Sequence, residues 1–157
     1  RIADIPPRLL LAIRQADCQL GEVMLSTFAI EIFRPAAESA PMAIVPCAGI
    51  VLHGRAFLFD GDAAPRALAF PVMALAGRVS TSETPGVLTW NPAARTLVAL
   101  QGNDECDGVV ARHTYRHNGR GGELNGFTLA KVERGRLGCG PRASENWQVI
   151  WQADAPH

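Results

Sequence analysis

Residues 87–100 read VLTWNPAARTLVAL, and this stretch decides the fold class that the sequence predicts. Two apolar-rich runs, Val87 to Trp90 and Thr96 to Leu100, flank a connector that contains Asn91 and Pro92. Short runs with β-branched and aromatic residues favour strands, and a short connector of turn-forming residues favours antiparallel pairing of its neighbours. The stretch therefore predicts a β-hairpin.

Short strand-like runs recur on both sides of this hairpin, separated by Gly, Pro and Asn. The runs are Phe28 to Ile32, Met42 to Val45, Arg55 to Phe59, Ala67 to Val72, Val109 to Arg116, Phe127 to Val132 and Trp147 to Trp151. Asn118-Gly119 and Asn125-Gly126 add residues that tolerate positive φ between two of the runs. The pattern predicts a mainly β (β-rich α+β) fold, built as an antiparallel sandwich or barrel-like meander.

One short helix is predicted near the N-terminus. Pro6 and Pro7 stand before apolar residues at helical spacing, among them Leu9 and Ile13. Proline is well tolerated in the first turn of a helix, so we expect about ten helical residues ending near Cys18. No long helical pattern follows residue 20.

Length and composition indicate one folded unit. A chain of 157 residues with 48% hydrophobic and 19% charged residues is typical of a single globular domain, expected here over residues 1–157. The chain begins at Arg1 with neither an initiating Met nor a signal peptide. We therefore expect a processed product or the C-terminal part of a longer precursor.

The charge balance argues against two classes of partner. Lys plus Arg and Asp plus Glu number 15 each, so the formal net charge is zero, without the basic excess of nucleic-acid or membrane-surface binders. The most apolar stretches, Leu9 to Ile13 and Ala67 to Ala76, are far shorter than the roughly 20 apolar residues of a membrane helix. We expect no nucleic-acid partner and no membrane-spanning segment.

The four cysteines are Cys18, Cys47, Cys106 and Cys139. Their even number, wide spacing and lack of a CxxC pair favour two disulfides in an oxidising compartment, either periplasmic or secreted. Three connectivities are open; the sequential pairing would close two loops of about thirty residues each. A zinc site is a weaker alternative because structural zinc ligands come in closely spaced pairs, and reduced, unpaired cysteines are another.

Several segments of the chain carry a family resemblance. They are Val45 to Cys47, Gly102 to Gly108, the strand around Tyr115, Gly126 to Leu129, Leu137 to Gly140 and Trp147 to Trp151. Over residues 5 to 153 the chain resembles the C-terminal half of an uncharacterised family of exported proteins from Gram-negative bacteria, the domain of unknown function numbered eleven-seventy-six. The resemblance implies export and a disulfide between Cys106 and Cys139, and it implies no activity.

The chain also departs from that family's pattern. It lacks the Tyr-Asn pair that follows Pro-Cys in the family, and Glu105-Cys106-Asp107 replaces Asp-Cys-Gly. Any family site that depends on those polar residues is not expected here.

One segment suggests metal binding. His113, Tyr115 and His117 alternate along a predicted strand and so share one face. Two imidazoles on one face, with Asp107 nearby, form a candidate transition-metal site. The favoured interpretation is plainer: an edge or outward strand face covered with soluble residues, against which Tyr115 packs its ring.

Other chemical patterns are weak or missing. The acidic residues 103–107 and 60–62 lack the spacing of a calcium loop, and no Ser lies in a Gly-x-Ser-x-Gly motif. Gly119 to Gly122 lacks the strand-to-helix context of a phosphate loop, and Trp147 and Trp151 are predicted to be core residues sharing a face with Val149. We expect no cofactor.

The sequence therefore favours a non-catalytic periplasmic or cell-envelope protein that binds another macromolecule, such as an envelope protein in a larger assembly. The alternative is a periplasmic metal or small-ligand binding protein that uses His113 and His117. A hydrolase with an unrecognised carboxylate pair ranks last.

Overall fold

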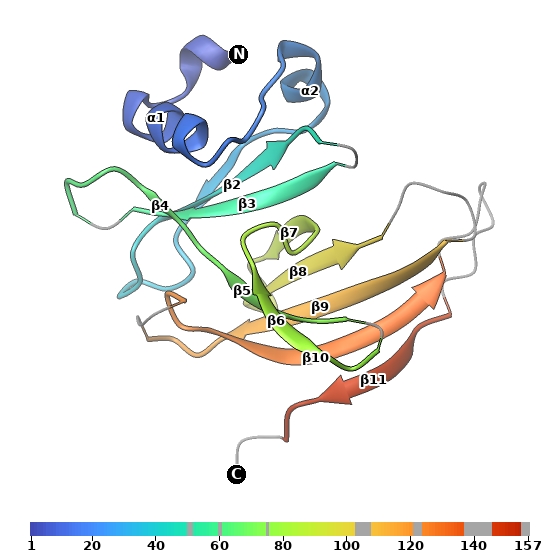
Figure 1. Ribbon diagram of the computed structural model, residues 1–157. Coiled ribbons are helices and arrows are strands. Elements are labelled where there is room, and N and C mark those ends of the chain that lie inside the picture. Colours follow the sequence, from blue (N-terminus) through green and yellow to red (C-terminus); the bar gives the residue numbers. More distant parts are fainter. Residues whose placement is uncertain are drawn as a thin grey trace.

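The computed structural model describes residues 1–49, 52–59, 61–74, 76–102, 108–120, 124–136 and 146–154. Within these ranges, a helical layer and three antiparallel sheets make up the fold (Figure 1). The mainly β, antiparallel fold class predicted from the sequence is confirmed, and the sheets form a sandwich instead of a closed barrel.

The first sheet has four strands in the order β1-β2-β3-β4. Their bounds are Glu31–Phe33, Met42–Cys47, His53–Leu58 and Arg66–Ala67. All six residues of β2 are buried, because β2 lies in the interior of this sheet and both of its faces are covered.

The other two sheets follow along the chain. β5 (Phe70–Met73) pairs with β6 (Val79–Ser82). The remaining strands form a sheet in the order β11-β10-β9-β8-β7, with bounds Val87–Asn91 for β7, Thr96–Gln101 for β8, Val109–His117 for β9, Phe127–Arg136 for β10 and Gln148–Gln152 for β11. The hairpin predicted from residues 87–100 is confirmed, since Val87 pairs with Leu100 and Asn91 with Thr96.

The helices are η1 (Ile2–Asp4), α1 (Pro7–Gln15) and α2 (Glu22–Thr27). Figure 1 shows α1 and α2 on the side of β2 and β3 that faces away from the five-stranded sheet. The predicted N-terminal helix is α1: Pro7 occupies its first turn, and Leu9 and Ile13 are buried against Val45 and Phe57. The short helix α2 was not predicted, because the alternating apolar residues that follow it favoured a strand from Phe28 onward.

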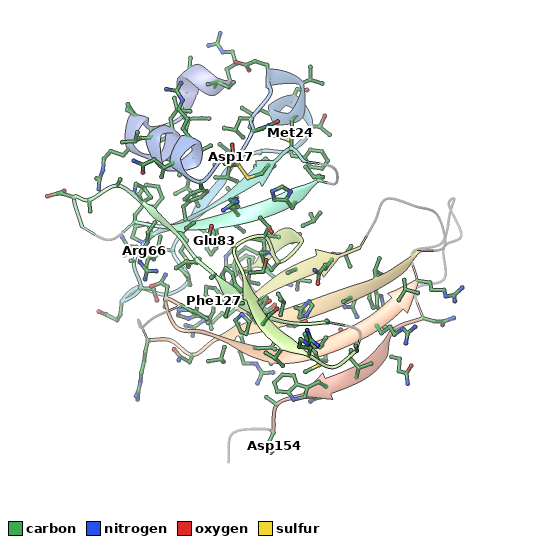
Figure 2. The ribbon with its side chains drawn as sticks, in the orientation of Figure 1. Asp17, Met24, Arg66, Glu83, Phe127 and Asp154 are labelled. Carbon is green, nitrogen blue, oxygen red and sulfur yellow. A yellow bond between two sulfur atoms is a disulfide. The ribbon has the colours of Figure 1, made fainter. Side chains whose placement is uncertain are left out.

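The main core lies between the first sheet and the five-stranded sheet. Trp90 is central to it, stacking on Phe33 at a centroid distance of 4.8 Å and meeting Phe127 edge-on at 5.7 Å. Figure 2 labels Phe127 in this layer. Buried aromatic side chains supply much of the apolar area that stabilises a core of this size.

Gly54 lies where β3 of the first sheet contacts β7 of the five-stranded sheet. Its backbone N–H donates to the carbonyl of Gly86 over 2.8 Å, and a Cβ at Gly54 would lie 3.1 Å from Leu88. A side chain at this position would crowd β7, so glycine permits the approach of β3 to β7.

Three strand predictions need correction. The run Phe28 to Ile32 forms a strand only from Glu31, and this strand, β1, ends at Phe33. The run Ala67 to Val72 divides between β4 and β5, which belong to different sheets. Trp147, Val149 and Trp151 do not share a core face, because Val132 pairs with Trp151 whereas Glu133 pairs with Val149. The extra residue in β11 forms a bulge that turns Val149 outward, where it is 48% exposed.

Candidate functional site

Cys18 and Cys47 form a disulfide with a Cα–Cα distance of 5.1 Å. It joins the end of α1 to the end of β2, beside the labelled Asp17 in Figure 2. The predicted participation of these two cysteines in a disulfide is confirmed. Cys106 and Cys139 lie outside the described residues, so their pairing stays a prediction.

His113 lies on β9, the central strand of the five-stranded sheet, and its side chain is fully buried. Its Nε2 accepts a hydrogen bond from the Met73 N–H over 2.9 Å. The next inward-facing residue, Tyr115, donates its hydroxyl to the carbonyl of Pro71 over 2.8 Å. The interpretation of this strand as an edge or outward face is therefore wrong: its alternating residues attach β5 to the sheet from inside the core.

His117 is 5% exposed and connects four segments of the chain. Its Nδ1 lies 3.0 Å from the Arg95 guanidinium and 3.1 Å from the Gly119 N–H, and both of these groups are donors. The proton of the neutral ring is therefore on Nε2, which donates to the carbonyl of Asn125 over 2.9 Å and lies 3.0 Å from the Ser39 hydroxyl.

Burial lowers the pKa of both histidines. For His113 the Met73 carbonyl, which lies 3.2 Å from Nε2, opposes this effect because it would accept a hydrogen bond from the charged ring. For His117 the contact with Asn125 opposes it, and the nearby charge of Arg95 adds to it. Both rings are therefore neutral structural groups at neutral pH.

The described residues do not assemble the metal site suggested by the sequence. His113 and His117 make separate hydrogen bonds on either side of Tyr115, and Asp107 lies outside the described residues. In the part of the chain that the structure describes, no group of three His, Cys, Asp or Glu side chains is placed to hold a metal ion. The two histidines alone do not make a ligand set.

The outer face of the five-stranded sheet carries a charged cluster that the sequence analysis missed. Glu133 is 5% exposed and accepts from Arg112 over 2.8 Å and from Lys131 over 3.0 Å. Burial alone would raise the pKa of Glu133, but these two cations hold it below its ordinary value. The Arg112 guanidinium also lies 4.0 Å from the ring centroid of Trp147, so the cluster packs β9 and β10 against the start of β11.

A hollow of about 510 Å³ lies at one end of strands β9 to β11. Its described lining residues are Arg116, Asn118, Thr128, Leu129, Ala130, Gln152, Ala153 and Asp154. Asp154, labelled in Figure 2, is the single carboxylate among them. A carboxylate pair of the kind used in glycoside hydrolysis is therefore not assembled by these residues.

An apolar surface surrounds α2 and β1, and we call it the α2–β1 surface. Val23, Phe28 and Ile32 are 83%, 42% and 51% exposed, although all three are large hydrophobic residues. They occur between residues 23 and 32, the stretch that includes most of α2 and the start of β1; Figure 2 labels Met24 of α2. Three large exposed apolar residues so close together in the chain, two of them lining adjacent hollows, differ from the single exposed apolar residues that are common on protein surfaces.

Two hollows adjoin this surface, one on each side of the segment that leads into β1. The helix-side hollow has about 260 Å³ and is lined by Arg1, Asp4, Ile5, Pro6, Leu25, Ala29, Ile30 and Ile32. The sheet-side hollow has about 250 Å³ and is lined by Thr27, Phe28, Ala29, Ile44, Pro46, Leu52, His53, Gly54, Val87 and Leu88. Most of these side chains are apolar, so both hollows favour apolar contacts.

β1 is the outermost strand of the first sheet. Its register pairs Glu31 with Ile44, Ile32 with Ala43 and Phe33 with Met42. Ile32 therefore shares the helix-side face with Ala43, whereas Glu31 and Phe33 share the face toward the five-stranded sheet. The apolar alternation of residues 28–32 predicts a strand, but it indicates neither how short β1 is nor that β1 lies at the edge of its sheet.

The chain matches no protein-family model, no curated protein and no solved structure. The family resemblance of the C-terminal segments therefore stays a prediction. Among the helices that the structure describes, none combines the length and the apolar character needed to cross a bilayer.

Proposed function

We propose that this protein is a non-catalytic protein of the periplasm or cell envelope that binds another envelope protein, as an accessory subunit of a larger assembly. The observation that carries the proposal is the α2–β1 surface, on which Val23, Phe28 and Ile32 are exposed beside two apolar hollows. Grouped exposed apolar residues are typical of protein-binding sites, because leaving them in water forgoes the free energy of burial.

The disulfide supports the compartment in this proposal. Cys18 and Cys47 are joined within the chain, and intrachain disulfides persist mainly in oxidising compartments. The same disulfide links the segment after α1 to β2, and β2 is the strand with which β1 pairs. The binding surface is therefore built on a cross-linked support, which limits the ordering cost of association.

Site-specific photo-crosslinking in the source cells tests the proposal. Benzoylphenylalanine is placed at Phe28 or Ile32, and at Val79 as a matched control, because Val79 is 58% exposed on the separate β5–β6 pair. We expect a crosslinked product of one defined mass from positions 28 and 32 and none from position 79. Equal labelling at all three positions, or no product at positions 28 and 32, would contradict the proposal.

A further inference from the structure

We infer that the partner contributes an extended strand that adds to the free edge of β1, with apolar residues on the helix side and a basic residue opposite Glu31. This inference rests on the proposed function and specifies how the α2–β1 surface binds. Strand addition of this kind takes its affinity from main-chain hydrogen bonds and its specificity from pockets for alternate side chains.

The backbone of β1 provides the main-chain hydrogen-bonding groups that strand addition needs. β1 pairs with β2 on one side, and no described strand pairs with its other side. A sheet edge leaves N–H and C=O groups directed outward and available to another chain. Natural proteins commonly cover or block such edges, so an edge beside exposed apolar residues favours an incoming strand.

The helix-side hollow provides a pocket for alternate side chains of the added strand. Ile32 is directed to the helix side of the sheet and lines this hollow together with Ile5 and Leu25. Successive residues of an added strand alternate between the two faces, and those beside Ile32 would lie about 5 Å from it. Apolar residues at these alternate positions would extend the contact into the hollow.

Glu31 adds charge complementarity to the backbone edge and the apolar hollow. Partial burial raises the pKa of its carboxyl, and it forms none of the ion pairs found among the described residues. Its cross-strand neighbour Ile44 lines the sheet-side hollow, as does Phe28. A Lys or Arg on the added strand would pair its charge with Glu31 and lay its aliphatic stem along this apolar face.

The other exposed edges do not offer the same combination. β6 is also an edge strand with an exposed valine, Val79, but Ser80, Thr81 and Ser82 follow it. Neither of the apolar hollows is lined by a residue of β6. β7 is another edge strand and lines the sheet-side hollow through Val87 and Leu88, but Ile32 of β1 is the one residue of a described strand that lines the helix-side hollow. The helix-side hollow and the neighbouring carboxylate of Glu31 therefore single out β1.

Labelled peptides test the inference by fluorescence anisotropy with the disulfide-bonded protein. The probe is a short peptide of alternating Val and Lys, and its controls are a Val/Glu peptide, a Val/Thr peptide, and two Val/Lys peptides N-methylated at one or the other alternate set of residues. We expect saturable binding of the Val/Lys peptide and weaker binding of the Val/Glu peptide. N-methylation should abolish binding in one set only, because alternate N–H groups of an added strand point toward β1.

Substitutions in the protein give matched controls. Ile32→Asp should abolish binding of the Val/Lys peptide, and Val79→Asp should leave it unchanged. Glu31→Gln should weaken the Val/Lys peptide about two- to fivefold, the range of an exposed ion pair, without changing the affinity of the Val/Thr peptide. Because Ile32 is 51% exposed, Ile32→Asp should keep the wild-type circular dichroism spectrum, which separates lost binding from lost folding.

Three results would overturn the inference: no binding of any peptide, equal effects of the two N-methylation sets, or dimerisation of the protein alone that Ile32→Asp abolishes. The last result would make a second copy of the chain the occupant of the edge. A crosslinked partner at position 28 without peptide binding would leave the proposed function standing and remove strand addition. Peptide binding without a crosslinked partner would support strand addition at β1 and remove the proposed function.

Discussion

The guanidinium of Arg95 lies 3.0 Å from Nδ1 of His117, and this contact determines the protonation state of the ring. Arginine only donates hydrogen bonds, so Nδ1 must accept and the proton of the ring must be on Nε2. The imidazole therefore joins the β7–β8 turn, through Arg95, to the loop before β2, through Ser39. A second proton on His117 would replace the acceptor at Nδ1 with a donor that faces a cation.

We expect stability to fall as the pH drops below neutrality. The folded-state pKa values of His113 and His117 are lowered from 6.5, so the unfolded chain binds protons first on acidification. The two neutral histidines contribute fully to the free energy of unfolding above about pH 6.5, and this contribution is lost as the pH falls through their folded-state pKa values. The free energy of unfolding then falls by up to about 1.4 kcal/mol per pH unit for each proton.

Urea unfolding at a series of pH values between neutral and mildly acidic measures this effect. His117→Gln, which keeps one donor and one acceptor, should reduce the slope. Arg116→Gln on the exposed face of the same strand should leave the slope unchanged. A wild-type free energy of unfolding that stays constant through this range would contradict the assignment of two neutral buried rings.

Replacing the histidines should affect stability and not metal content. His113→Ala removes the acceptor for the Met73 N–H, and His117→Ala removes the acceptor for Gly119 and the donor to Asn125. Each loss leaves buried polar groups unpaired, which costs about 1–3 kcal/mol. Thermal unfolding measures the loss of stability. Metal analysis of protein isolated from its source cells measures the metal content. Stoichiometric metal in the wild type that both substitutions remove would instead restore the metal-binding hypothesis.

Local sequence pattern predicted the elements whose apolar residues are bounded by clear turn or cap residues. The strands β7, β8 and β9 are short runs with apolar residues separated by Gly, Pro and Asn, the helix α1 has apolar residues at helical spacing after Pro6 and Pro7, and each formed where it was expected. β6 was missed because its sequence, VSTS, has a single large apolar residue, and it forms through pairing with β5. Pairing partners are distant in the sequence, so local pattern does not reveal them.

The candidate site shows the same limit. The alternation of His113, Tyr115 and His117 correctly placed three side chains on one face, but alternation does not say which face is buried. The answer depends on Met73, Pro71 and Ser39, which are far away along the chain. Similarly, the exposure of Ile32 follows from the edge position of β1, which is a property of the sheet and not of the run Phe28 to Ile32.

Removing the disulfide should destabilise the protein substantially. Cys18 and Cys47 are 29 residues apart, and closing a loop of that length stabilises a fold by about 3–4 kcal/mol in the chain-entropy model. Urea unfolding of Cys18→Ser with Cys47→Ser measures the change. The mass of the denatured, unreduced wild type gives the count: about 4 Da below the reduced mass for two disulfides and about 2 Da for one.

The charged cluster around Glu133 should contribute more to stability than the ion pair of Arg55 and Glu83. Glu133 is enclosed, with 6% of its side chain exposed, and it accepts from both Arg112 and Lys131. Glu83 has 51% of its side chain exposed and pairs with one arginine. Glu133→Gln should cost about 1–2 kcal/mol, because two cations lose their shared carboxylate, whereas Glu83→Gln should cost at most about 0.5 kcal/mol.

Salt separates the two ion pairs further. Exposed pairs are screened strongly at high ionic strength and enclosed pairs much less. Urea unfolding at low and at high NaCl concentration should therefore show the cost of Glu133→Gln largely retained, while the small cost of Glu83→Gln disappears. If both substitutions cost the same and both effects vanish in salt, the Glu133 carboxylate is solvated in solution. Its contacts with Arg112 and Lys131 would then have no part in joining β9 to β10.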